Sequence, residues 1–523
     1  MSRFLSYIAR YKNYAKAKEN TMAKFNKNTT THANKTPDTV NVEGIASYSR
    51  DFEKEVASII LNSLFNGDSY YETEQERLNV IKKIVSENHD KAEFLAKAMV
   101  YARNEGNLRS VTHYLANMLI ENVKGTNFIK PALEMTLIRP DDATEIIALW
   151  NSRNDKSIPN PLRRAIKNRL ENKWDSYQLK KYFGNGDVKV SNLINICHPK
   201  PKDEKQRLVF KQALEGKLPS IETAQTVNAE STKENRADKY SNMIKERKLG
   251  YMALLKNLTN ILESGADDET IDAICELLRN EDVVKKSRVL PFRFVQAYKH
   301  VKKVENMDVF KVKKILQSIE DGFILSSGNI NIVDSNEKVA LLLDESGSMG
   351  GFWDTNDNDK TPFEIGKALM ASMLCGLNKE NTIGMLWANN AREVNIDKGP
   401  MTFITETKTK GGGTNLGQAI KSLISSNTFV DKIIIFTDMQ QNDIGSWGES
   451  SFESIVKNYR KINPNVKILF WNLEGYGKGT PMKLTHNILE VNGFSDKMLQ
   501  IIPKIWKNQD ALIDEINAIQ LKN

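Results

Sequence analysis

Five oxygen-bearing side chains in the C-terminal third of the chain have the types and spacing of ligands for a hard divalent cation. Asp344, Ser346 and Ser348 alternate in a short segment that directly follows an apolar run. Thr414 follows three consecutive glycines, and Asp438 follows a second apolar run. Carboxylate and hydroxyl oxygens suit Mg²⁺ or Mn²⁺, with water completing a near-octahedral shell. The pattern predicts a divalent cation at these five residues if the fold brings them together.

The same residues have a simpler interpretation, in which the Ser and Thr side chains cap helices or form turns. A metal would not imply catalysis, because no general base or nucleophile stands beside the segment. Most of its ligands are hydroxyls, and no pair of carboxylates is arranged to hold two metal ions about 4 Å apart. We therefore expect no enzymatic activity, and a metal-dependent nuclease is the less favoured alternative.

The elements that would position these residues follow an alternating pattern. Short apolar runs predict buried strands at residues 338–343, 382–388, 432–436 and 466–471, and helical patterns lie between them at 363–377, 416–424 and 452–459. This alternation is typical of a doubly wound α/β domain, whose parallel sheet is covered on both faces and whose sites lie at the carboxyl ends of strands. We assign the domain to residues 337–523.

The preceding part of the chain has a different texture. Beyond Asp51, apolar residues recur at intervals of three and four with no convincing strand, which predicts consecutive amphipathic helices. Their number favours a solenoid of stacked helix pairs over a compact bundle, and we assign residues 46–336 to it. Residues 1–45 are basic and rich in Asn and Thr, which predicts a flexible arm.

Composition narrows the class of partner and the setting. The 523 residues include 74 Lys and Arg against 66 Asp and Glu, a net charge of +8, and the excess falls before residue 337. Such an excess favours a polyanionic partner. Three cysteines far apart in sequence argue against disulfides and a sequence-local zinc site. No apolar run approaches the roughly 20 residues that cross a bilayer, and the N-terminus lacks a secretory apolar centre, so we expect a cytoplasmic protein without membrane contact.

Basic residues concentrate between positions 150 and 182. Arg163, Arg164 and Lys167 fall near one helix face, where a row of cations repels itself unless a polyanion screens it. Three aromatic residues follow, which would either stack on unpaired bases or belong to the core: Trp174, Tyr177 and Tyr182.

Two further groups combine imidazole with basic side chains. His198 ends a predicted helix and is followed closely by Lys200, although a lone His at such a position is often a cap or a packing residue. Arg109 and His113 are four residues apart, with Arg103 nearby. The alternative for this second group is an ion-pair cluster at a helix end.

The metal motif matches the metal-ion-dependent adhesion site of von Willebrand factor A-type domains. A long helical region followed by such a domain resembles the Ro autoantigen family, whose members carry a TROVE module. The stretches that carry the resemblance are residues 48–52, 101–110, 177–182, 197–201 and 290–294, and the likeness covers about residues 45–523. Residues 1–45 and the Asp- and Asn-rich loop at 351–362 depart from the family pattern, and either could change which partner reaches the metal.

The resemblance implies a monomeric ring of HEAT-like helical repeats closed by the A-type domain. In that family Ser346, Ser348 and Thr414 would contact the metal directly, Asp344 and Asp438 would act largely through water, and one coordination position would remain open for an acidic partner.

The resemblance also implies RNA partners. Small structured Y-type RNAs would bind the outer basic surface, single-stranded 3′ ends of misfolded RNAs would enter the central hole, and an exoribonuclease is a candidate partner. The residues that we assign to RNA are Arg103, Arg109, His113, Arg163, Arg164, Lys167, His198 and Lys200. The alternative function is a metal-dependent adapter scaffold that binds acidic peptides.

Overall fold

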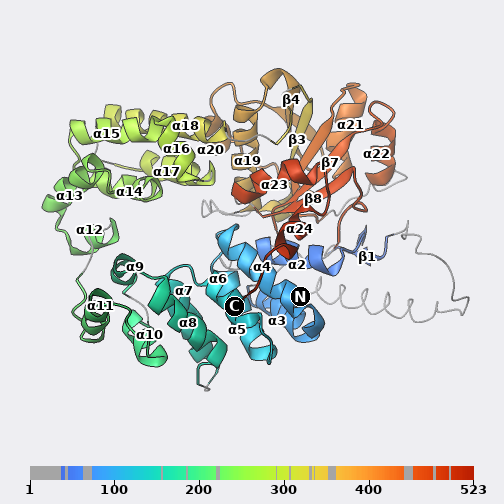
Figure 1. The fold of residues 1–523 in the computed structure, drawn as a ribbon. Coiled ribbons are helices and arrows are strands. Elements are labelled where there is room, and N and C mark those ends of the chain that lie inside the picture. Colours follow the sequence, from blue (N-terminus) through green and yellow to red (C-terminus); the bar gives the residue numbers. More distant parts are fainter. Residues whose placement is uncertain are drawn as a thin grey trace, which may run out of the picture.

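A curved array of helices and an α/β domain together form a closed ring in the computed structural model of the chain (Figure 1). The structure describes residues 37–41, 45–62, 74–154, 157–183, 187–219, 224–289, 291–305, 308–328, 332–334, 336–350, 361–440, 452–474, 479–493 and 496–522. Most of the arm expected at residues 1–45 and of the loop at 351–362 lies outside these ranges. Within them, no helix combines the length and apolar character needed to span a membrane.

The first half of the helical region stacks each helix on the next but one. Its helices are α2 (Phe52–Asn62), α3 (Glu74–Glu87), α4 (Ala92–Asn104), α5 (Ser110–Asn122), α6 (Ile129–Thr136), α7 (Pro140–Arg153), α8 (Asn160–Asn172), α9 (Ser176–Lys181), α10 (Val190–Cys197) and α11 (Glu204–Leu214). Contacts join α2 to α4, α4 to α6, α6 to α8 and α8 to α10, while α3, α5 and α7 form a second row. This two-layered stacking is the helical-repeat arrangement expected from the sequence.

The second half of the helical region continues the ring. Its helices are α12 (Ala224–Glu230), α13 (Lys233–Lys245), α14 (Tyr251–Glu263), α15 (Asp268–Arg279), α16 (Glu281–Ser287), α17 (Pro291–Lys302) and α18 (Val309–Ser327). Phe294 is fully buried between Tyr251 and Phe323, with ring centroids 5.9 and 6.3 Å away. Gly322 permits this close packing, because a Cβ there would lie 2.7 Å from the carbonyl oxygen of Leu278.

The C-terminal domain is built on a six-stranded sheet in the order β5-β4-β3-β6-β7-β8. The strands are β3 (Val339–Asp344), β4 (Thr382–Trp387), β5 (Ala391–Val394), β6 (Lys432–Thr437), β7 (Lys467–Asn472) and β8 (Ile488–Asn492). Only the β4–β5 pair is antiparallel. The helices are α19 (Pro362–Gly376), α20 (Pro400–Glu406), α21 (Gly417–Ser425), α22 (Phe452–Tyr459), α23 (Asp496–Ile505) and α24 (Ala511–Asn517).

Both faces of this sheet are covered, as a doubly wound domain requires. Leu341 and Leu343 belong to one buried apolar cluster, whereas Ala340 and Leu342 belong to another. Successive side chains of a strand point to opposite faces, so the two clusters lie on opposite sides of the sheet. The expected fold class, a helical-repeat ring with a C-terminal α/β domain, is confirmed.

The chain's N-terminal segment closes the ring on the C-terminal domain. The strand β1 (Thr39–Val40) pairs with β2 (Ala46–Ser47), so the described end of the predicted flexible arm is ordered. Tyr48 then pairs with Thr480 by backbone hydrogen bonds in both directions. The order of these residues follows from their contacts with the C-terminal domain, which the arm's composition does not reveal.

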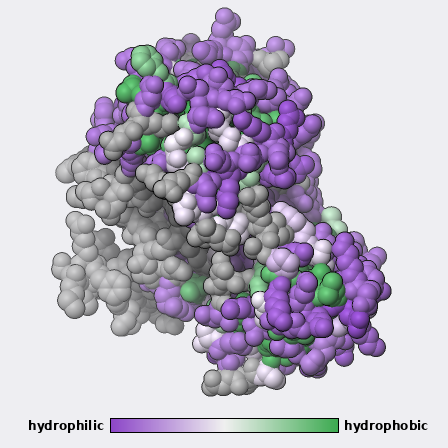
Figure 2. Space-filling view, turned by 90° about the vertical axis from the view of Figure 1, so that its left-hand side faces the viewer, coloured by the Kyte–Doolittle hydropathy of each residue, from purple (hydrophilic) through white to green (hydrophobic). Residues whose placement is uncertain are grey.

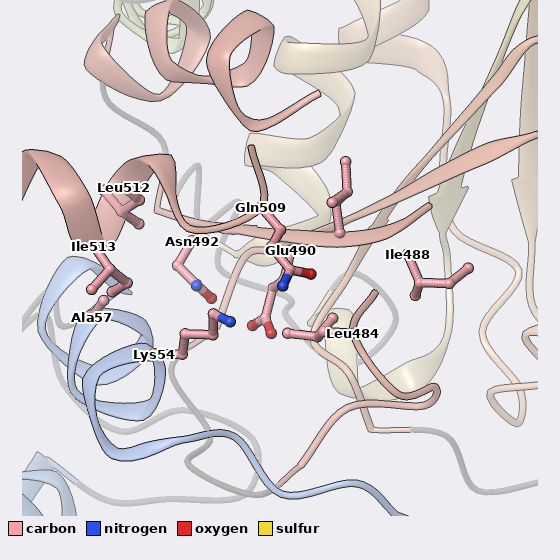
Figure 3. Close-up of a pocket in the computed structure, with 10 residues that line it drawn as sticks. Lys54, Ala57, Leu484, Ile488, Glu490, Asn492, Gln509, Leu512 and Ile513 are labelled. Carbon is pink, nitrogen blue, oxygen red and sulfur yellow. The ribbon is translucent and has the colours of Figure 1, made fainter. Parts of the chain in front are cut away.

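A small cavity lies in this joint (Figure 3). Lys54 and Ala57 of α2 face Glu490 of β8 and Leu512 of α24 across it. Its volume is about 20 Å³, which accommodates about one water molecule. The cavity is therefore part of a packed joint and is too small to be a ligand site.

The other joint connects α17 and α18 to α19 and α20. Lys299 pairs with Glu364 at 3.1 Å, and the hydroxyls of Ser327 and Ser372 lie 2.8 Å apart. Contacts at both ends thus tie the helical region to the α/β domain.

Candidate metal site and basic surface

The proposed metal ligands lie where the carboxyl ends of β3 and β6 meet. Asp344 is the last residue of β3, and its Oδ1 accepts a hydrogen bond from the backbone N–H of Ser346 at 2.9 Å. Its Oδ2 accepts from the hydroxyl of Thr437, the last residue of β6, at 2.8 Å. β3 is the strand from which the sheet order runs in opposite directions, the usual location of a site in this class of fold.

The other four candidate ligands lie on segments near this carboxylate. The hydroxyls of Ser346 and Ser348 lie 3.2 Å apart, and Asp438 follows β6 directly. The backbone N–H of Gly347 donates to the carbonyl of Gly412, two residues before Thr414, at 3.3 Å. All five candidate ligands are buried. The structure therefore gathers them at one edge of the sheet, as the strand pattern predicted.

The glycines before Thr414 have a structural reason. Gly412 has a φ of +110°, a conformation that residues with a side chain rarely adopt. A Cβ at this position would lie 2.8 Å from the amide nitrogen of Asn389. A glycine at position 412 therefore allows both this backbone conformation and the close approach of the Asn389 side chain.

Electrostatics at this edge favour a bound cation. Burial and the nearby charge of Asp438 raise the pKa of the Asp344 carboxyl well above its usual range. Both carboxylates are fully buried, and two such groups repel each other unless a proton or a cation lies between them. The donor set of two carboxylates and three hydroxyls fits a hard divalent ion. Nowhere in the described ranges, this edge of the sheet included, do three or more His, Cys, Asp or Glu side chains form a group suited to a metal. The candidate site therefore depends on two carboxyl groups together with hydroxyls.

The basic surface predicted around α8 is assembled from two helices. Arg163 and Arg164 of α8 are exposed, and α8 packs beside α10 at the lower rim of the ring in Figure 1. Burial raises the pKa of the Cys197 thiol to about 12, while the charges of Arg163 and Lys167 oppose that rise. Those two cations therefore lie beside the end of α10, although they precede Cys197 by 30 positions or more in sequence.

His198 caps α10 in a left-handed conformation with a φ of +47°, and its side chain is exposed. Lys200 is also exposed, and its backbone N–H donates to the carboxylate of Glu171 at 2.6 Å. Glu171 also lies 4.0 Å from the ammonium of Lys167. The structure therefore brings Arg163 and Lys167 of α8 close to the segment that carries His198 and Lys200. We call this surface, with the exposed neighbour Arg164, the α8–α10 surface.

The second imidazole group is a buried ion-pair cluster around Asp142. Arg103 pairs with this carboxylate at 2.8 Å, Arg109 at 3.1 Å and His113 at 3.0 Å. Arg103, His113 and Asp142 are buried, so their charges are compensated inside the protein. These contacts favour the ion-pair alternative for Arg103, Arg109 and His113, and their assignment to RNA stays an untested prediction.

The three aromatic residues divide between core and surface. Trp174 is buried, and its indole N–H donates to the carbonyl of Ile138 at 3.2 Å. Tyr177 is 51 % exposed, and the ammonium of Lys181 lies 5.8 Å from its ring centroid. The ammonium of Lys181 also lies 5.5 Å from the ring centroid of Tyr182. The guanidinium of Arg139, which is distant in sequence, lies 5.0 Å from the centroid of the same ring.

Arg139 and Lys181, which pack on these tyrosine rings, were not among the residues that we assigned to RNA from the sequence. The spacing of Tyr177 and Lys181 on one helix could have indicated their contact. Nothing local in the sequence indicates the contact of Arg139, because it depends on the packing of α7 against a later segment.

Comparison with known proteins agrees with this architecture. The TROVE domain model matches residues 204–339, and a domain of unknown function, DUF7788, matches residues 414–515. The structure of the Deinococcus radiodurans RO (RSR) protein superimposes with a TM-score of 0.57 and 16 % sequence identity, covering 86 % of this chain and all of that one. The chain thus contains a TROVE-domain match over residues 204–339 and has the same overall fold as that RO protein.

Two curated relatives are similar to a short part of this chain. Telomerase protein component 1 of Mus musculus and that of Rattus norvegicus are each 35 % identical to it over 75 residues. These residues are 14 % of this chain, and they span 3 % of the length of each relative.

Proposed function

We propose that this chain is an RNA-binding component of a ribonucleoprotein and that the α8–α10 surface binds structured RNA. The observation that carries the proposal is the convergence of Arg163 and Lys167 with the segment of His198 and Lys200, beside exposed Arg164. Lys and Arg contacts to phosphates supply most of the sequence-independent affinity for nucleic acid. The match to the TROVE domain supports the same function.

The finer part of the proposal concerns the kind of RNA. We propose a small Y-type RNA stem on the α8–α10 surface and a single-stranded 3′ end at the ring, where exposed Tyr177 offers a stacking platform. An exoribonuclease that acts on the same RNA is the proposed protein partner.

The side of the molecule shown in Figure 2 offers little apolar surface to the alternative function, a metal-dependent adapter scaffold. In Figure 2, hydrophilic residues dominate the described part of the visible side, and hydrophobic residues form small separate patches. Stable protein-binding surfaces usually present a larger apolar centre.

The test is fluorescence anisotropy with a labelled RNA that has a stem and a single-stranded 3′ tail. Replacing Arg163, Arg164 and Lys167 together by Ala should weaken binding at least ten-fold at low salt and flatten the slope of log affinity against log salt. A matched control removes three exposed lysines of α3 and the turn that follows it, with the substitutions Lys82→Ala, Lys83→Ala and Lys91→Ala. This control should change RNA affinity little. Equal effects of the two triple variants would remove the α8–α10 surface from RNA binding.

His198→Ala separates a contact from a packing role in the same assay. The side chain is exposed, so the variant should bind structured RNA several-fold more weakly with an unchanged melting temperature. A parallel loss of both properties would mean that His198 stabilises the turn and does not touch RNA.

We also propose that Asp344, Ser346, Ser348, Thr414 and Asp438 hold Mg²⁺ or Mn²⁺. The buried carboxylate pair and the three hydroxyls support this proposal. When bound, the ion would supply an electrophilic position for an acidic group of a partner.

A further inference from the structure

A buried tryptophan beside the candidate metal site has an indole N–H without a protein partner. Trp387 is the last residue of β4, and its side chain is fully buried. Its indole N–H meets no acceptor in the part of the chain that the structure describes. By contrast, the indole N–H groups of buried Trp174, Trp471 and Trp506 donate to backbone carbonyls at 3.2, 2.6 and 2.8 Å. A buried donor without a protein partner is uncommon, and an ordered water is its usual acceptor.

The strand register places this tryptophan beside a proposed metal ligand. Trp387 is the register partner of Asp344 in the parallel pair of β4 and β3. The backbone N–H of Glu345 donates to the carbonyl of Trp387 at 2.8 Å, which joins the two strand ends. Neighbouring strands lie about 4.8 Å apart, and the side chains of register partners lie on the same face of the sheet. The indole and the carboxylate therefore start from adjacent positions in one row of side chains.

The buried apolar clusters identify the face on which this row lies. Leu342 stands two residues before Asp344 on β3, and the alternation along a strand puts both side chains on the same face. Leu342 and Trp387 belong to the same buried cluster. Leu416 and Met439, each within two residues of a candidate ligand, belong to it as well. The indole thus lies on the side of the sheet that is lined by residues of three ligand-bearing segments.

The carboxylate of Asp344 has acceptor positions left for a water molecule. Its Oδ1 accepts from the backbone N–H of Ser346, and its Oδ2 accepts from the hydroxyl of Thr437. Thr437 ends β6, the neighbour of β3 on the side away from β4, so the hydroxyl and the indole flank the carboxylate. Since a carboxylate has about four acceptor positions, a water can bind on the indole side while another position faces a cation. Such a water would accept from the indole N–H and donate to the carboxylate.

We propose that the indole N–H of Trp387 holds a water molecule that bridges to the Asp344 carboxylate and positions this carboxylate for the divalent cation. Trp387 is a positioning residue, because it acts through the water and the carboxylate and touches neither the cation nor a partner. The hydroxyl of Thr437 orients the carboxylate from one side, and the water held by the indole orients it from the other. This inference rests on the proposed metal site and adds a residue that the five-ligand pattern does not contain.

The first experiment looks for the water bridge in the full-length protein without metal. Nuclear magnetic resonance of protein labelled with ¹⁵N-tryptophan resolves the indole N–H groups, and the signal that is absent from Trp387→Phe, or from Trp387→Tyr if the Phe variant does not fold, belongs to Trp387. This signal should show a cross-peak to water and should shift in Asp344→Asn. The signal of Trp471, whose N–H donates to a carbonyl, should do neither. A Trp387 signal without a water cross-peak, or one that is unchanged in folded Asp344→Asn, would overturn the proposal.

The second experiment measures the consequence for the cation. Calorimetry should show that Trp387→Phe binds Mn²⁺ at least three-fold more weakly than the parent does, because its carboxylate loses the bridge. Trp471→Phe also removes a fully buried indole from the same sheet, and it should bind Mn²⁺ as the parent does. Melting temperatures show whether each variant is folded. Equal Mn²⁺ affinity of the parent and folded Trp387→Phe would contradict the positioning role.

A double variant separates the bridge from the packing of the indole ring. In metal-free buffer, the fall in urea midpoint caused by Trp387→Phe should be at least halved when Asp344→Asn is already present. The fall caused by Trp471→Phe should be the same in both backgrounds. Additive effects of Trp387→Phe and Asp344→Asn would mean that no water joins the two side chains, and the proposal would be wrong.

Failure of the metal site and failure of the bridge give different results. Absence of Mn²⁺ binding by the parent would overturn the metal site and, with it, the positioning role, while the water cross-peak and the coupling to Asp344 would still establish the bridge. Mn²⁺ binding by the parent together with additive effects would leave the metal site intact and remove Trp387 from it.

Discussion

The guanidinium of Arg392 holds the carboxylate of Glu345 in a two-pronged contact, with its Nη2 2.7 Å from Oε2 and its Nε 3.2 Å from Oε1. Glu345 stands between the first two candidate metal ligands, and only 2 % of its surface is exposed. Its carboxylate also accepts from the backbone N–H of Lys410, just before the glycines. Arg392, on the edge strand β5, thus holds Glu345, and Glu345 in turn holds the segment that leads to Thr414.

Arg392→Ala should lower the free energy of unfolding by about 2 kcal/mol, because it leaves a buried carboxylate without its charged donor. Urea unfolding of the two proteins measures the difference. Arg392→Lys keeps the charge but loses the planar fork, so it should fall between the parent and the Ala variant. An unchanged midpoint for Arg392→Ala would show that Glu345 is held by its backbone contacts alone.

The ring should open at its N-terminal joint when Arg50 is lost. The Nε and Nη2 of Arg50 bind the carboxylate of Glu490 on β8, and both side chains are almost fully buried. Arg50→Ala should cost about 3–5 kcal/mol, because it leaves a buried charge unpaired. Hydrogen exchange should then rise in α2 and β8 before it rises in the rest of the chain.

A double variant provides the control for this joint. Arg50→Met with Glu490→Leu removes both charges and should be much closer to the parent in stability than Arg50→Ala. If the single and double variants are equally destabilised, the loss comes from packing around Arg50 and not from the unpaired Glu490.

The cluster around Asp142 should make stability depend on pH. Burial alone would lower the pKa of His113, but hydrogen bonds to Asp142 and Glu145 outweigh burial and raise it. Both ring nitrogens lie 3.0 Å from carboxylate oxygens, as a protonated imidazole requires. A raised pKa gives stabilisation that is complete below the unfolded value of about 6.5 and disappears as pH rises through the folded pKa.

His113→Gln should therefore be destabilised by about 1–3 kcal/mol at pH 6, and the difference from the parent should shrink as pH rises. Chemical unfolding at several pH values between 6 and 9 measures this trend. A difference that stays constant over the range would mean that His113 is neutral in the folded protein. Asp142 behaves in the opposite sense: the hydrogen bonds of His113 and Arg103 overcome burial and hold its pKa well below the usual range, so its contribution disappears in acid.

The sequence predicted the strands that are buried along their whole length, because such strands are continuous runs of apolar residues. The four central strands are apolar along their length because helices cover both faces, and each appears near its predicted position. The edge strand β5 and the strand β8 were missed. β5 has only four residues, two of them charged, and β8 contains Glu490, whose charge is buried only because Arg50 arrives from the far end of the chain.

The same distinction applies to the candidate sites. The proximity of Asp344 and Asp438 could be predicted from the sequence, because both stand at the carboxyl ends of strands of a parallel sheet. By contrast, Asp142 of α7 binds Arg103 of α4, which stands 39 positions earlier in the sequence. Their contact depends on how the helices pack. Spacing on one helix therefore could not distinguish an RNA contact from an internal ion pair.

The last prediction concerns the proposed metal. Asp344→Asn with Ser346→Ala removes a carboxylate charge and a hydroxyl from one loop, which leaves too few strong ligands for an ion that demands near-octahedral coordination. Mn²⁺ should raise the melting temperature of the parent but not that of the double variant, and Asp397→Asn, which changes an exposed carboxylate of the same domain, should respond as the parent does. RNA affinity of the double variant should stay within about three-fold of the parent, since the α8–α10 surface lies outside this domain. End-labelled RNA incubated with each protein in Mg²⁺ or Mn²⁺ tests the remaining alternative, because metal-dependent shortening by the parent and not by the variant would establish a nuclease.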